Sequence, residues 1–310
     1  MKKTVRHLVS IRDLSAAEIQ TLFRSTRNLK KQRAGRKQPL AGKTLGLLFY
    51  KPSVRTRVSF EVGMAQLGGQ ALYIGPVELG QGKRESAKDV AKVLSRYLDG
   101  IVARTFAHAD VVEMARHASI PVINGLSDDS HPCQALADLF TVQEKLGTLK
   151  GVRLAYVGDG NNVCHSLLEL CVRLGVHLNV ATPADYRPDP EVVRWVSQEA
   201  KRTGSRIGYF QDPKEAVGNA QVVYTDVWAS MGQESEKEKR AGIFRPFQVN
   251  AELLRQAGKN ALFMHCLPAH RGEEVTDEVM DSRASVVYDQ AENRLHAQKA
   301  ILLWLMGGAG

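Results

Sequence analysis

Short apolar runs of strand length alternate with longer amphipathic runs along most of this chain. The apolar runs cover residues 44–49, 71–74, 101–103 and 122–123, and the amphipathic runs that follow them cover 57–67, 86–98, 109–118 and 132–146. Strict alternation is typical of βαβ units, in which parallel strands form a sheet covered by helices on both faces. A helix before the first strand is predicted by Ser15-Ala16-Ala17-Glu18, a capping box followed by apolar positions at helical spacing.

The alternation restarts after residues 147–151, which predicts a second sheet. Strands are expected at 152–157, 176–181, 206–209, 222–225, 261–264 and 286–287, with a helix at 162–174. The predicted fold class is therefore α/β, with two doubly wound parallel-sheet domains covering 1–147 and 148–289. The apolar final helix, about 290–310, is expected to pack back on the first domain. Ligands of such sheets bind at the carboxyl ends of the strands, so the loops after strands are the candidate sites.

Length and composition agree with two domains, because 310 residues with 44% hydrophobic content are enough for two cores. The basic amino end lacks the apolar run of a signal peptide, and no stretch approaches the roughly 18 apolar residues of a membrane helix. The 4 cysteines are too scattered for a disulfide framework, and Cys164 and Cys171 are expected in the core. A soluble cytoplasmic protein without a membrane partner is predicted.

The formal charge of +9, from 42 Lys and Arg against 33 Asp and Glu, suits an anionic partner. Charge alone does not distinguish nucleic acid from a small phosphate. The densest basic stretch, residues 30–37, has no aromatic residue for base stacking, and it is expected to be a solvated surface at a helix C-terminus. No nucleic-acid partner is therefore predicted.

The loop after the first strand, Lys51-Pro52-Ser53-Val54-Arg55-Thr56-Arg57, leads directly into a helix. It combines two arginines, two hydroxyls and free helix-start amides, which are all donors suited to a phosphate dianion. The planar guanidinium of arginine binds two oxygens at once, as a lysine cannot. The alternative is that Ser53 only caps the helix and the arginines are solvated.

This loop resembles the phosphate-binding signature Ser-Thr-Arg-Thr-Arg of the aspartate and ornithine carbamoyltransferase family, with Val54 in place of a threonine that would add a hydrogen bond. Arg104 after a short strand, the loop His131-Pro132-Cys133-Gln134 and Arg294 on the final helix also match the family. The resemblance implies that carbamoyl phosphate is bound by Ser53, Val54, Arg55, Thr56, Arg57, Arg104, His131, Gln134, Cys266, Leu267 and Arg294. Gln81, with Lys83 or Arg84 as substitutes, is the candidate that reaches a neighbouring subunit.

Two further loops are similar to the ornithine branch of the family. Residues 226–232 resemble its Asp-x-x-x-Ser-Met-Gly loop, and residues 265–268 match its His-Cys-Leu-Pro loop. An anionic Asp226 suits the α-ammonium of ornithine and would repel an aspartate substrate. The resemblance implies ornithine binding by Asn162, Asp226, Ser230 and Met231, and catalytic roles for Cys266, Arg104, His131 and Asp226.

The implied activity is direct transfer of a carbamoyl group from carbamoyl phosphate to the δ-amine of L-ornithine, giving L-citrulline and phosphate in arginine metabolism. The family further implies a cleft site between the domains, no cofactor, and a homotrimer or multiple of trimers with sites at subunit interfaces. Putrescine or N-acylornithine remains an alternative acceptor.

Two other hypotheses arise from single motifs. Residues 158–163, Gly-Asp-Gly-Asn-Asn-Val, follow a strand and allow a nucleotide-dependent oxidoreductase, although Val163 occupies the third glycine position. A metal site is not expected, because no ligand pair has zinc-finger spacing and the neighbouring His265 and Cys266 would point in different directions.

Overall fold

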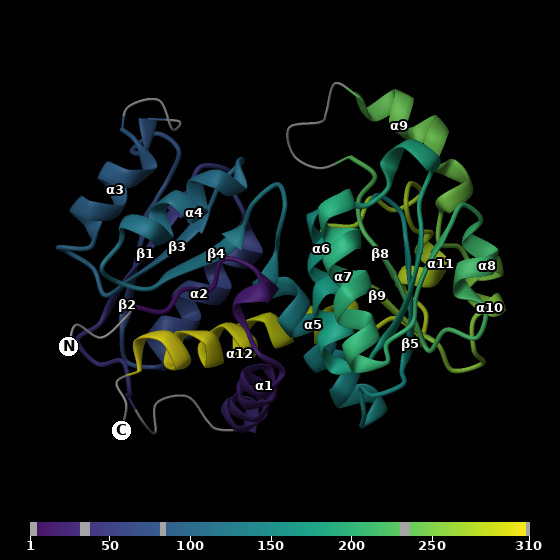
Figure 1. Cartoon of the computed structure of the whole chain (residues 1–310), viewed down its shortest axis with the longest axis horizontal. Helices are drawn as coiled ribbons and strands as arrows, with labels where there is room; N and C mark the ends of the chain where they lie inside the picture. Colours follow the sequence, from purple (N-terminus) through teal and green to yellow (C-terminus); the bar gives the residue numbers. More distant parts are fainter. Residues whose placement is uncertain (1–4, 32–37, 81–84, 230–235, 308–310) are drawn as a thin grey trace. The chain divides into compact units, whose positions relative to one another are not determined.

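The computed structural model describes residues 5–31, 38–80, 85–229 and 236–307. The chain forms two compact units, the first made of Met1–Ala137 with Glu292–Gly310 and the second of Asp138–Ala291. Each unit contains one parallel sheet (Figure 1). Two helices, α5 (Pro132–Leu146) and α12 (Val287–Met306), contribute residues to both units.

The sheet of the first unit has the strand order β2-β1-β3-β4. Its strands are β1 (Thr44–Phe49), β2 (Gln70–Ile74), β3 (Gly100–Arg104) and β4 (Val122–Leu126). The helices α3 (Ala87–Leu94) and α4 (His108–His117) bury apolar side chains against one face of this sheet. Because β1 lies between β2 and β3, the chain winds outward in both directions, and the loops after β1 and β3 meet where the winding reverses.

Three helices of the first unit, α1 (Ala16–Lys31), α2 (Val54–Gln66) and α12, pack together (Figure 1). Lys30 of α1 donates to Asn293 of α12 at 2.8 Å. Gly63 of α2 lies so close to α12 that a Cβ atom there would be 3.3 Å from the side chain of Lys299. The predicted capping box of α1 is confirmed, since Ser15 and Glu18 bond to each other's backbone N–H.

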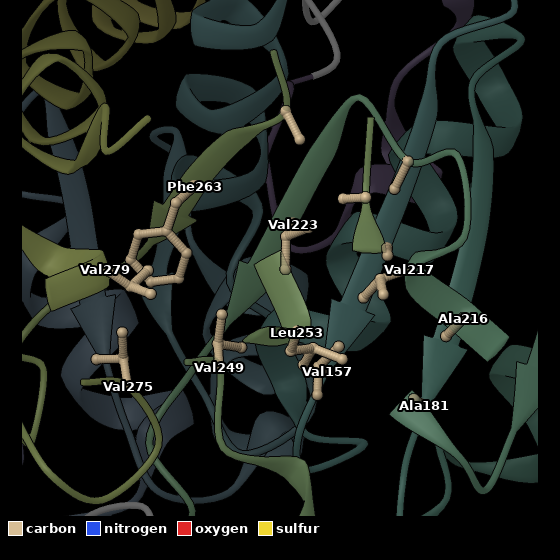
Figure 2. Close-up of a cluster of buried hydrophobic side chains, with 14 of the residues drawn as sticks. Val157, Ala181, Ala216, Val217, Val223, Val249, Leu253, Phe263, Val275 and Val279 are labelled. Carbon is tan, nitrogen blue, oxygen red and sulfur yellow. The ribbon is translucent and has the colours of Figure 1, made fainter. Parts of the chain in front are cut away.

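The sheet of the second unit has the strand order β7-β6-β5-β8-β9, which places its switch point between β5 and β8. Its strands are β5 (Arg153–Val157), β6 (His177–Ala181), β7 (Ile207–Phe210), β8 (Val222–Thr225) and β9 (Leu262–His265). Its further helices are α6 (Asn162–Leu174), α7 (Pro190–Thr203), α8 (Pro213–Val217), α9 (Lys237–Phe244), α10 (Ala251–Gln256) and α11 (Asp277–Met280). Figure 2 shows Phe263 of β9 pointing toward Val279 of α11, within the buried cluster that covers one face of the sheet.

The prediction of two doubly wound parallel sheets is confirmed, and so is the burial of Cys164 and Cys171. The strand predicted at 286–287 is wrong, because Val287 begins α12 and Gln290 N already donates to the carbonyl of Val286 at 2.9 Å. The basic stretch is described only to Lys31, and residues 32–37 lie outside the described residues. Within the described parts, none of the helices combines the length and apolar character that a bilayer crossing demands.

Candidate active site

In the first unit, the loop after β1 ends in a capped helix start. Ser53 is the N-cap of α2, and its Oγ accepts a hydrogen bond from the backbone N–H of Thr56 at 3.3 Å. Thr56 is fully buried, and its Oγ1 accepts a hydrogen bond from Nη2 of Arg294 at 3.0 Å. The cap and the final helix therefore place a guanidinium at the amino end of α2, where the helix dipole also favours an anion.

Three predicted residues, Arg104, His131 and Gln134, are buried in the same unit. Arg104 ends β3, beside β1 across the switch point, and His131 directly precedes Pro132, the first residue of α5. Burial lowers the pKa of His131 well below its usual value, and the positive charges of Arg294 and Arg104 add to this effect. A neutral imidazole beside two guanidiniums is a hydrogen-bonding group for a polar ligand, not a further fixed charge.

Lys51 is a member of this site that sequence reasoning missed, although it begins the phosphate loop. Lys51 is only 7% exposed, and its Nζ lies 4.9 Å from the centroid of the Phe106 ring. The pKa of Lys51 is lowered to about 8, mainly by burial and also by the positive charge of Arg104, while the negative charge of Asp128 acts in the opposite direction. The signal was its place at the end of a buried strand, where a lysine is seldom enclosed without an anion.

Two residues of the predicted phosphate set lie on the surface. Val54 is 76% exposed. The guanidinium of Arg57 donates from Nε to Glu61 at 3.0 Å and lies 3.9 Å above the ring of Tyr73. Arg55, two positions earlier on the helix, is half-buried. Arg57 is therefore engaged by Glu61 of its own helix and by Tyr73 of β2, whereas Arg55 stands between the cap Ser53 and Thr56 at the start of the helix.

The second unit brings the loops after β5, β8 and β9 together around Asp226. This buried carboxylate accepts hydrogen bonds at Oδ1 from the N–H of Val227 at 2.8 Å and at Oδ2 from the side-chain amide of Asn161 at 2.7 Å. The Sγ of Cys266 donates to Oδ1 at 2.8 Å. Asn161 also caps α6. Asn162, the residue predicted to bind ornithine, follows Asn161 directly and is half-buried at the start of the helix.

The loop that carries Cys266 is fixed by the buried His265. Its Nδ1 accepts from the N–H of Leu267 at 2.8 Å, so its proton is on Nε2, which lies 3.1 Å from the buried Glu274. Leu267 has a φ of 60°, a left-handed conformation that is costly for a side chain of this size and typical of functional loops. These contacts hold the thiol of Cys266 beside Asp226.

The nitrogen and sulfur atoms of His265 and Cys266 do come close, within 4.8 Å of each other and of Asp226, so the expectation that the two side chains point apart is wrong. Both ring nitrogens of His265 are nevertheless engaged in hydrogen bonds within the loop. A metal ion would have to displace one of them, so the arrangement fits a hydrogen-bonded site better than a metal centre.

The glycine loop after β5 is closed by the protein's own backbone. A Cβ atom on Gly160 would lie 2.3 Å from the backbone nitrogen of Pro188, and the N–H of Gly160 donates to the carbonyl of Tyr186 at 2.9 Å. In dinucleotide-binding loops the equivalent space admits the pyrophosphate. The packing therefore argues against the oxidoreductase hypothesis.

Several predicted residues lie outside the described residues. They are Gln81 with its substitutes Lys83 and Arg84, and Ser230 and Met231.

Both halves of the chain match models of known protein domains. The carbamoyl phosphate-binding domain of the aspartate/ornithine carbamoyltransferases matches residues 6–144, and their aspartate/ornithine-binding domain matches residues 150–305. The chain is similar to the ornithine carbamoyltransferase of Pyrococcus horikoshii, with 56% identity over 98% of this chain and 96% of the relative. It is also 56% identical to the anabolic ornithine carbamoyltransferase of Pyrococcus furiosus, over 98% of this chain and 97% of that relative.

Solved structures agree with these matches. The ornithine carbamoyltransferase of Pyrococcus furiosus superposes with a TM-score of 0.95 and 53% identity, covering 100% of both chains. The enzyme of Thermus thermophilus superposes with a TM-score of 0.88 and 46% identity, covering 98% of this chain and 100% of the other.

Proposed function

The chain belongs to the aspartate/ornithine carbamoyltransferase family, and from this premise we propose that it transfers the carbamoyl group of carbamoyl phosphate to the δ-amine of L-ornithine, releasing L-citrulline and phosphate. The observation that carries the choice of acceptor is the buried carboxylate of Asp226 beside the thiol of Cys266. A fixed negative charge attracts the ammonium group of ornithine and repels an aspartate substrate.

In the first unit, the proposed phosphate ligands are Ser53, Arg55, Thr56 and the amides at the start of α2. Arg104, His131 and Gln134 hold the carbamoyl group, and Arg294 supports the site from the final helix through Thr56. Lys51 adds a further positive charge. As the tetrahedral intermediate forms, Arg104, Thr56 and neutral His131 donate to its oxyanion, and each such donor is typically worth about 3 to 4 kcal/mol.

In the second unit, Asp226 pairs with the α-ammonium of ornithine, and Cys266 accepts the proton that the δ-ammonium must lose. An amine of this type has a pKa near about 10.4, so the reactive neutral form is scarce at neutral pH. Cys266 takes this proton in its thiolate form and so becomes the thiol that donates from Sγ to Oδ1 of Asp226, which stays ionised and keeps its charge for the α-ammonium. The neutral amine then attacks the carbamoyl carbon, the attacking nitrogen gives its second proton to the departing phosphate as the carbon–oxygen bond breaks, and no covalent enzyme intermediate forms.

The remaining family properties are part of the same proposal. Residues 1–147 bind carbamoyl phosphate, together with the helix at about 290–310, and residues 148–289 bind ornithine. The remaining proposed binding residues are Val54, Gln81, Leu267, Asn162, Ser230 and Met231. Arg57, whose guanidinium pairs with Glu61, is expected to contribute little. The assembly is a cytoplasmic homotrimer or a multiple of trimers, with Gln81 reaching the neighbouring subunit's site.

The test is citrulline formation measured by colour with ornithine, aspartate, putrescine and N-acetylornithine as parallel acceptors. Ornithine is expected to be the preferred acceptor, because only it combines a free α-ammonium for Asp226 with a free δ-amine. Equal or better turnover of putrescine or N-acetylornithine would overturn the choice of acceptor, and no carbamoyl transfer at all would overturn the reaction.

A further inference from the structure

A buried arginine outside the proposed ligand set connects the loops that surround Asp226. Arg240 on α9 is 6% exposed. Its Nη1 donates to Oδ2 of Asp159 at 2.8 Å and to the carbonyl of Trp228 at 2.7 Å. Its guanidinium lies 4.6 Å above the ring of Tyr186. A single guanidinium therefore holds three segments of the second unit.

Two of these segments are the ones that build the Asp226 site. Asp159 lies in the loop after β5, two residues before Asn161, and Trp228 lies two residues after Asp226. The loops are also joined directly, because Asn161 donates to Asp226 at 2.7 Å. The hydrogen bonds of Arg240 are thus a second link between the same loops.

We propose that Arg240 and Asp159 are positioning residues for the amino-acid substrate. By linking the two loops, they hold the carboxylate of Asp226 in the position and orientation that ornithine requires. The inference rests on the proposed function. Neither side chain needs to touch ornithine. A planar guanidinium suits the task because it bonds a carboxylate and a carbonyl in fixed directions at once, which a lysine ammonium does not.

The strength of the ion pair between Arg240 and Asp159 also depends on pH. The pKa of Asp159 is raised to about 6, mainly by burial and also by the negative charge of Asp226, while the hydrogen-bonded Arg240 acts in the opposite direction. The other groups that face the pair are His165 on α6, Cys164 on α6, the hydroxyl of Tyr156 on β5 and Glu236 at the start of α9, which accepts from Nε of Arg240 at 3.2 Å. As the pH falls through about 6, Asp159 gains a proton and the bridge weakens.

The experiment compares steady-state kinetics of the full-length enzyme and its Arg240→Gln, Arg240→Lys and Asp159→Asn variants. Arg240→Gln is expected to raise the KM for ornithine by about tenfold or more, while the KM for carbamoyl phosphate changes by less than about twofold. Arg240→Lys is expected to restore part of the loss. Asp159→Asn is expected to raise the ornithine KM and to remove its rise between about pH 7 and 5.5, because no carboxyl remains to titrate.

Arg245→Gln is the matched control, since Arg245 follows α9 directly and is exposed. A general loss of folding would alter both KM values or the active fraction together, and circular dichroism melting measures it separately. If Arg240→Gln does not fold, the ornithine KM of Arg240→Lys and the pH profile of Asp159→Asn test the inference instead. The inference fails if the wild type uses ornithine but the variants have the same KM for ornithine and the same pH profile as the wild type. It also fails if the variants change the KM values for ornithine and carbamoyl phosphate equally. A wild type that does not carbamoylate ornithine overturns the proposed function instead.

Discussion

Replacement of Asp226 by asparagine tests the proposed choice of acceptor most directly. The carboxylate is buried and accepts from three groups, Cys266 Sγ, the N–H of Val227 and the amide of Asn161, at 2.7 to 2.8 Å. An asparagine side chain has nearly the same shape, so it can keep two of these bonds through its oxygen. Its amide group would face the Asn161 amide, and it would carry no charge for the substrate ammonium.

The expected magnitude follows from these contacts. A hydrogen bond to a charged group is worth about 1.5 to 3 kcal/mol, and about 1.4 kcal/mol corresponds to a factor of ten. Asp226→Asn should therefore lower kcat/KM for ornithine by about ten- to a hundredfold. The Asn161 amide loses its acceptor in this variant, which lowers the free energy of unfolding by about 1 to 3 kcal/mol and leaves a folded but less stable protein.

The assay is citrulline formation at varied ornithine with saturating carbamoyl phosphate, together with the equilibrium binding of carbamoyl phosphate to the same protein. Binding of carbamoyl phosphate is expected to stay unchanged, because the residues proposed to hold it belong mainly to the other unit. Asp185→Asn is the control, since Asp185 is exposed in the same unit. An unchanged kcat/KM for ornithine in a well-folded Asp226→Asn variant would refute the reasoning.

Three other changes have defined outcomes. Arg55→Ala should weaken carbamoyl phosphate binding by about tenfold or more. Arg57→Ala should change it little, because the guanidinium of Arg57 already pairs with Glu61. Calorimetric titration of both variants measures the two affinities, and equal losses would contradict the different roles given to the two arginines. Cys266→Ala should lower kcat and shift its pH dependence toward alkaline values, because the amine loses its proton acceptor; full turnover across pH would show that Cys266 is not that acceptor. For Lys51, the positive charge is present below its pKa of about 8 and is lost as the pH rises through it, so the KM for carbamoyl phosphate should increase between about pH 7 and 9. Lys51→Arg should flatten this rise, because a guanidinium stays charged in that range, and a rise of the same size in the variant would exclude Lys51 as its cause.

Local patterns in the sequence were sufficient for the class of fold. Buried parallel strands are continuous apolar runs, and the helices between them carry apolar positions at helical spacing, so their alternation predicted both sheets. The capping box at Ser15 also predicted the start of α1, because a cap is made by neighbouring residues. Residues 286 and 287 were misread because two consecutive apolar residues fit a buried strand and the first turn of a helix equally well.

Side-chain contacts across the chain were beyond the reach of such patterns. Motifs and a family resemblance supplied Arg55, His131, Asp226 and Cys266 as site residues, because each lies in a short stretch of recognisable chemistry. Nothing in a linear pattern indicates that Asn161, the neighbour of the predicted Asn162, donates to Asp226. The same holds for Arg57, which belongs to the signature but turns to Glu61 and Tyr73.

Local spacing and residue type therefore specify the two sheets and the chemical character of the loops that follow their strands. Which groups are buried together depends instead on how distant segments of the chain pack. This packing encloses Lys51 beside Arg104, places the thiol of Cys266 against a carboxylate forty positions away in the chain, and bridges Asp159 to Trp228 through Arg240. Burial, distance and the pKa shifts that follow from them are properties of packing between distant segments, and no local pattern contains them.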